Sequence, residues 1–90
     1  MYQLFSIIKD RQQNPQIGSY THHLMSLGED AILKKVGEEA MEVILAAKSQ
    51  GKQRLIEEVS DLFYHTLVLL AYQGVSLDKI YQELENRHSS

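Results

Sequence analysis

Residues 29–74 read EDAILKKVGEEAMEVILAAKSQGKQRLIEEVSDLFYHTLVLLAYQG, and this stretch decides the fold. In its first half, apolar side chains recur at the i, i+3, i+4, i+7 spacing of an amphipathic helix. The second half, from about Gln53 to Tyr72, repeats this spacing with a wider apolar arc. Gly51 separates the two halves and Gly74 follows the second. Because so short a connection joins them, the pattern predicts two long antiparallel helices that form a hairpin.

Shorter helices are expected on both sides of this hairpin. Leu4, Ile7 and Ile8 predict a first short helix, and Ser19 or Thr21 can cap a second that ends at Gly28. Ser76 is expected to cap a last helix. No segment alternates with the period of two that is typical of strands, so the sequence predicts an all-α fold. At 90 residues, the chain is expected to form one domain over residues 1–90.

The composition excludes several classes of protein. Hydrophobic residues make up 43% of the chain and charged residues 23%, which argues against intrinsic disorder. The absence of Cys excludes disulfides, thiolate metal sites and a catalytic cysteine. A net charge of -3 is not the basic excess that nucleic-acid binding requires. The apolar run 67–72 is too short to cross a membrane, and the first ten residues lack the pattern of a signal peptide. A cytoplasmic location without membrane or nucleic-acid partners is therefore expected.

Two groups of acidic residues stand at mirrored positions in the predicted hairpin. Glu42 and Glu58 are each eight residues from position 50, and Glu39 and Asp61 are each eleven residues from it. In an antiparallel hairpin, residues equidistant from the turn lie at the same height. The register therefore predicts that four carboxylates converge about 12 Å from the turn, at a rise of about 1.5 Å per residue.

Four carboxylates held together would repel one another unless a cation neutralises them. Oxygen ligands suit hard cations, so the cluster predicts a Mg²⁺ site, with Mn²⁺ as the alternative metal. The competing interpretation is that both groups are ordinary solvated helix faces. Lys35 and His65 stand one turn beyond the carboxylates in the same register, where they either contact phosphate or form ordinary ion pairs.

The apolar arc of the second long helix is wide enough to require cover on several sides. The short flanking helices of one chain cannot supply all of it. We therefore expect a homo-oligomer, at least a dimer, in which two hairpins pair and complete a four-helix bundle.

The acidic pattern also resembles that of a known family. Glu39-x-x-Glu42 followed by Glu58-x-x-Asp61 is similar to the signature of the MazG-like all-α nucleoside triphosphate pyrophosphohydrolases. Longer stretches extend the resemblance to the phosphoribosyl-ATP pyrophosphatase family, from end to end. These stretches are 19–21 (SYT), 28–30 (GED), 34–42 (KKVGEEAME), 46–48 (AAK), 61–65 (DLFYH), 67–70 (LVLL) and 74–77 (GVSL).

The resemblance implies hydrolysis of the α–β phosphoanhydride of 1-(5-phosphoribosyl)-ATP, which yields 1-(5-phosphoribosyl)-AMP and pyrophosphate in the second step of histidine biosynthesis. It also implies that Tyr20 and Thr21 contact the substrate, although they can equally serve as helix-capping residues. Either Glu38 or Glu57 would orient the attacking water. Two alternatives remain, namely a MazG-like house-cleaning hydrolase of other nucleotides and a non-catalytic helical assembly module.

Overall fold

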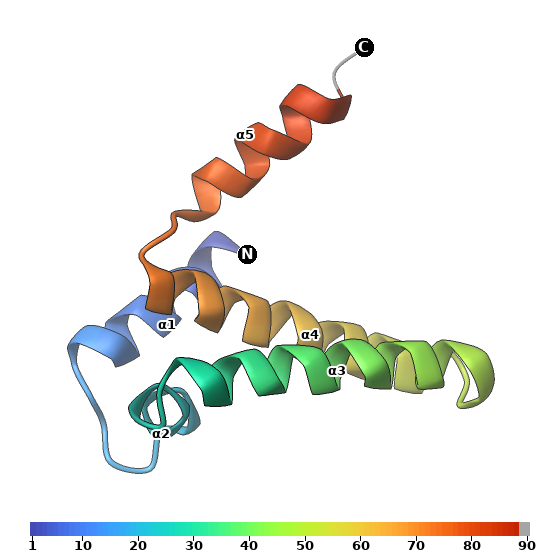
Figure 1. Cartoon of the computed structure of the whole chain (residues 1–90), viewed down its shortest axis with the longest axis horizontal. Helices are drawn as coiled ribbons and strands as arrows, with labels where there is room; N and C mark the ends of the chain where they lie inside the picture. The colour runs from blue at the N-terminus through green and yellow to red at the C-terminus, as the bar shows by residue number, and fades with distance from the viewer. Residues whose placement is uncertain (89–90) are drawn as a thin grey trace.

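The protein is described by a computed structural model over residues 1–88, in which five α-helices and no strand are present. In chain order the helices are α1 (Tyr2–Gln13), α2 (Tyr20–Ser26), α3 (Glu29–Ser49), α4 (Lys52–Gln73) and α5 (Leu77–His88) (Figure 1). This arrangement confirms the predicted all-α class. None of these helices combines the length and the apolar character needed to cross a bilayer.

Helices α3 and α4 form the expected hairpin and run side by side along the molecule (Figure 1). Only Gln50 and Gly51 connect them. Gly51 has a φ of 87°, a left-handed conformation that glycine adopts without the steric cost of a Cβ. At the far end, Gly74 closes α4 in the αL conformation at a φ of 72°. The predicted span of α4, about Gln53 to Tyr72, is therefore correct to one residue at each end.

The core gathers at the end of the hairpin that is remote from the turn. There α1 and α2 pack against the first turns of α3 and the last turns of α4. Ile8, Ile32 and Val68 are the largest side chains that are fully buried. The core leaves the half of the hairpin nearer to the turn less covered, and Glu39, Glu58 and Asp61 lie from the middle of the hairpin into that half.

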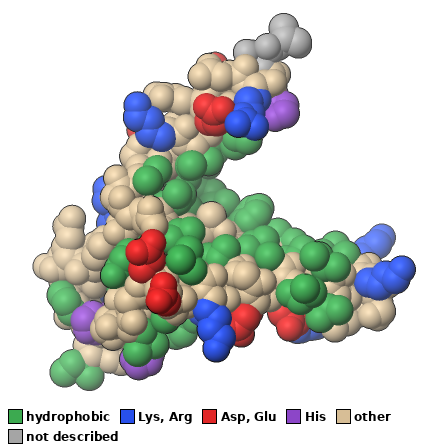
Figure 2. All heavy atoms as spheres, in the orientation of Figure 1, with side chains coloured by type: hydrophobic (Ala, Val, Ile, Leu, Met, Phe, Trp, Pro, Cys, Tyr) green, Lys and Arg blue, Asp and Glu red, His purple; other side chains and the backbone are tan. Residues whose placement is uncertain are grey.

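Helix α5 projects away from the hairpin (Figure 1). Its first residue, Leu77, belongs to the core, and Tyr2 Oη donates a hydrogen bond of 2.7 Å to Asp78 Oδ1. An apolar groove of about 330 Å³ lies between α4 and α5, with Phe63 on one wall and Leu84 on the other. Hydrophobic side chains gather in this groove and continue along the hairpin (Figure 2). The structure therefore leaves a substantial apolar surface open on one chain.

Candidate active site

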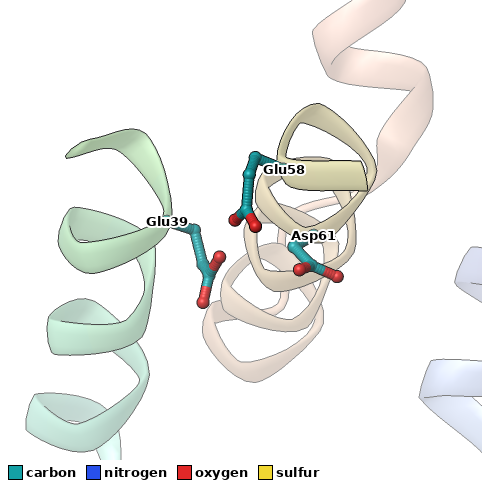
Figure 3. A group of neighbouring side chains, drawn as sticks. All are labelled: Glu39, Glu58 and Asp61. Atoms are coloured by element: carbon teal, nitrogen blue, oxygen red, sulfur yellow. The ribbon is translucent and has the colours of Figure 1, made fainter. Parts of the chain in front are cut away.

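Three carboxylates from both helices of the hairpin converge on one point. Glu39 on α3 and Glu58 on α4 face each other across the hairpin, and Asp61 lies beside Glu58 on α4 (Figure 3). One oxygen from each carboxylate lies within 4.8 Å of the others. The side chains of Glu39 and Glu58 are only 12% and 7% exposed, whereas Asp61 is exposed. We refer to Glu39, Glu58 and Asp61 as the carboxylate cluster.

Burial and repulsion act together on Glu58. Its desolvation raises the pKa of this carboxyl above the usual value, against the lowering effect of Arg54. The negative charges of Glu39, Asp61 and Glu42 raise that pKa further. The cluster thus concentrates charge that a cation would stabilise, and carboxylate oxygens from facing helices are ligands that Mg²⁺ accepts.

Glu42 occupies a different place from the other three predicted ligands. It lies about one turn nearer to Gly51 than Glu39 does, and it is half-buried. Its charge contributes to the raised pKa of Glu58, but it is not one of the three side chains that converge within 4.8 Å. Equidistance from the turn fixes the height of a residue along the hairpin and not its distance across the gap.

Glu57 is hydrogen-bonded to Arg54, a residue that the sequence patterns did not single out. Arg54 Nη1 donates to Glu57 Oε1 at 2.6 Å, and Nη2 donates to Glu58 Oε1 at 2.5 Å. Hydrogen bonds from Arg54 and Gln53 hold the pKa of the exposed Glu57 carboxyl below its usual range. The spacing of Arg54 three and four residues before these acids was the available signal, because such pairs share one helix face.

Lys35 borders the cluster from the side remote from the turn. Its Nζ lies 3.4 Å from Glu39 Oε1. Burial tends to lower the pKa of Lys35, but neighbouring Tyr20, Glu39 and Glu38 outweigh it and raise the pKa above the usual value. Lys35 also lines a cavity of about 320 Å³ together with Tyr20 and the exposed Glu38. A retained positive charge beside an open cavity can bind an anionic group.

His65 is buried and has both ring nitrogens engaged. Nδ1 lies 2.7 Å from the carbonyl oxygen of Asp61, which can only accept a hydrogen bond, so Nδ1 carries a proton. In the neutral ring, Nε2 then accepts from Tyr20 Oη at 2.9 Å. The imidazole therefore ties the start of α2 to α4 beside the carboxylate cluster.

Thr21 and Tyr64, the sequence neighbours of Tyr20 and His65, make a second connection between α2 and α4. The buried Thr21 hydroxyl hydrogen-bonds to the Tyr64 hydroxyl. Ser19 supplies the helix cap, since its Oγ accepts from the backbone N–H of His22 at 3.2 Å. Tyr20 itself is 48% exposed and lines two cavities, so it is the member of this group that is open to a ligand.

The sequence of this chain is similar to those of known proteins of one family. Residues 1–88 match the family described as phosphoribosyl-ATP pyrophosphohydrolase. A protein of Listeria monocytogenes named phosphoribosyl-ATP pyrophosphatase is 58% identical over 84 residues, which cover 93% of this chain and 81% of the relative. A protein of Lactiplantibacillus plantarum with the same name is 54% identical over 97% of this chain and 82% of the relative. The histidine biosynthesis bifunctional protein HisIE of Oceanobacillus iheyensis is 52% identical over 96% of this chain and 40% of that longer relative.

Proposed function

This chain belongs to the phosphoribosyl-ATP pyrophosphohydrolase family, and from that membership we propose that it hydrolyses 1-(5-phosphoribosyl)-ATP to 1-(5-phosphoribosyl)-AMP and pyrophosphate. The observation that carries the proposal in the structure is the carboxylate cluster, in which Glu39, Glu58 and Asp61 converge from two helices. Hydrolysis of a phosphoanhydride requires neutralisation of phosphate charge and an oriented water, and it requires no protein nucleophile.

We assign Glu39, Glu58 and Asp61, with Glu42 beside them, as the residues that hold Mg²⁺. Their charge, their burial and their oxygen donors support this assignment. Once bound, Mg²⁺ would neutralise the phosphate oxygens of the substrate and so favour departure of pyrophosphate. Mn²⁺ satisfies the same ligand chemistry.

The remaining site residues receive different roles. Lys35 and Tyr20 border a cavity beside the cluster, so we assign them to the phosphate and to the nucleoside part of the substrate. His65 and Thr21 lie behind them and hold α2 in place through their hydrogen bonds. Glu38 borders the same cavity, whereas the carboxylate of Glu57 is held by Arg54, and we therefore assign the orientation of the water to Glu38.

The test is pyrophosphate release from phosphoribosyl-ATP, compared with ATP and dUTP, each with and without Mg²⁺. We expect release from phosphoribosyl-ATP that requires the divalent cation. Faster release from ATP or dUTP would instead favour a house-cleaning nucleotide hydrolase. No release from any of the three would favour a non-catalytic assembly module.

We also propose that the working form is a homo-oligomer, at least a dimer. Phe63, Ile56 and Ile44 lie on the hairpin with exposed fractions of 49%, 59% and 61%. Together with the groove between α4 and α5 they make an apolar surface of a kind that soluble monomers rarely leave in water. Pairing of two hairpins would cover it and complete a four-helix core.

A further inference from the structure

Arg54 has no role in the reaction as proposed above. It lies in the first turn of α4, and its guanidinium is fixed by two carboxylates, Glu57 at 2.6 Å and Glu58 at 2.5 Å. The Arg54 side chain is 49% exposed, while that of Glu58 is 7% exposed. One end of this arrangement is therefore buried in the carboxylate cluster and the other faces solvent.

The guanidinium retains capacity for an anion. It has five N–H donors, and its two hydrogen bonds to described residues go to Glu57 and Glu58. Three donors are left on a planar group of permanent charge, whose geometry matches phosphate oxygens. The two anchoring carboxylates limit its motion, so less side-chain entropy is lost when an anion binds.

Arg54 and Lys35 bracket the carboxylate cluster along the hairpin. Lys35 precedes Glu39 by four residues on α3, so it stands on the side remote from the turn. Arg54 precedes Glu58 by four residues on the antiparallel α4, so it stands on the side of the turn. A cation on each side of the proposed metal position suits an extended polyphosphate rather than a compact anion.

The positions of two cavities indicate which end of the substrate lies near α2 and which lies near the turn. Both cavities lie on the side remote from Arg54. One of about 510 Å³ is lined by α2 and the residues just before it, and one of about 320 Å³ is lined by α2 and by residues of α3 that include Lys35. They offer the room that a base and two sugars require, whereas the half of the hairpin near Gly51 offers Arg54. We propose, on the basis of the proposed function, that Arg54 binds the departing pyrophosphate, and that the substrate lies with its nucleoside part toward α2 and its terminal phosphates toward the turn.

The test measures binding of two probes to the Mg²⁺-loaded protein by calorimetry, pyrophosphate for the turn side and AMP for the α2 side. In Arg54→Gln we expect pyrophosphate affinity to fall by about tenfold or more, the scale of one lost charged hydrogen bond, with AMP affinity unchanged. Arg54→Lys keeps the charge without the fork and should fall between. Arg87→Gln is the matched control, because Arg87 pairs with Glu83 at the same four-residue spacing on α5.

The results distinguish a wrong role for Arg54 from a wrong function for the whole chain. Circular dichroism and a Mg²⁺ titration of each variant establish that the fold and the metal affinity are retained. If the unsubstituted chain releases pyrophosphate from phosphoribosyl-ATP but Arg54→Gln binds pyrophosphate as tightly as the parent, the assignment of Arg54 is overturned alone. Equal losses of pyrophosphate and AMP affinity would overturn the proposed direction of the substrate. If the unsubstituted chain has no such activity, the proposed function fails and this inference with it.

Discussion

At the scale of single residues, Glu58 combines two opposed demands. Burial and the neighbouring carboxylates disfavour its charged form, and the proposed metal site requires that form. A residue that weakens the metal-free fold while serving the reaction is typical of functional sites, where local consistency is given up for chemistry. Glu58 should therefore affect stability and activity in opposite directions.

Substitution Glu58→Gln tests this opposition. The neutral amide keeps the size of the side chain and removes its charge. We expect pyrophosphate release to fall by about a hundredfold or more, the scale of losing one charge-stabilising group. The thermal midpoint of the metal-free protein should stay equal or rise, because repulsion with Glu39 and Asp61 is relieved.

The control is Glu83→Gln, which removes an exposed carboxylate from α5 that also bonds to an arginine. It should leave turnover unchanged. Full turnover by Glu58→Gln at saturating Mg²⁺, with helix content retained, would contradict the assignment of Glu58 as a metal ligand.

At the scale of elements, the attachment of α5 depends on a contact with the first helical residue of the chain. Tyr2 donates to Asp78, and the rings of Tyr2 and Tyr81 lie 5.2 Å apart. The hydrogen bond to Asp78 is the main reason that the pKa of Tyr2 rises from 10.0 to about 12. Since the folded state holds this proton more tightly, the contribution to stability is complete below pH 10 and is lost as the pH rises through about 12.

We therefore expect Tyr2 to give a late step at about pH 12 in an alkaline titration followed by ultraviolet absorbance, separate from the ionisation of Tyr20, whose pKa is also raised by burial. In Tyr2→Phe that late step should disappear, and amide hydrogen exchange should accelerate in α5 but not in the α3–α4 hairpin. Tyr72→Phe removes a tyrosine of α4 and should keep the late step. A step at about pH 12 that is unchanged in Tyr2→Phe would show that the Tyr2–Asp78 contact does not hold α5.

The elements also show how far the sequence could predict this site. Helical periodicity and the glycines located α4 to one residue at each end, and the register of the hairpin anticipated that Glu39, Glu58 and Asp61 meet. It did not anticipate that Glu42 lies near the other three carboxylates but outside the group that meets within 4.8 Å, because the height of a residue along a hairpin does not fix its distance across the hairpin. The register of the hairpin also gives no information on the bond from Arg54 to Glu58, because both residues lie on one helix; the four-residue spacing was its only signal in the sequence.

At the scale of the whole molecule, Mg²⁺ should stabilise the fold. A ligand that binds only the folded state adds about 1.4 kcal/mol to the free energy of unfolding when its concentration is tenfold above Kd. For a domain of this size, that corresponds to a rise of several degrees in the thermal midpoint. Differential scanning calorimetry with millimolar MgCl₂, against NaCl of equal ionic strength, measures it. Glu58→Gln should lose most of the response, and a midpoint in the parent that ignores Mg²⁺ would favour the solvated-face interpretation.

Association is the second expectation at this scale. If two chains cover the apolar surface of the hairpin, folding and association are coupled, and the thermal midpoint should rise with protein concentration. Light scattering should give at least twice the 10.3 kDa of one chain. Phe63→Glu should lower the particle mass, because a charge would then stand in the covered face.

The matched control is Ile17→Glu, since Ile17 is fully exposed in the connection before α2 and lies outside that face. A particle of 10.3 kDa that is fully helical and fully active at micromolar concentration would exclude the dimer.

The two-residue connection at Gln50 and Gly51 has a kinetic consequence as well. Contacts between segments that are close in sequence form early in folding, because little chain entropy is lost in closing a short loop. The hairpin is thus an early event, and its closure is the same step that brings Glu39 toward Glu58 and Asp61. Electrostatic repulsion then opposes the transition state and not only the finished fold. Ions that screen or bind these carboxylates should therefore increase the rate at which the chain folds.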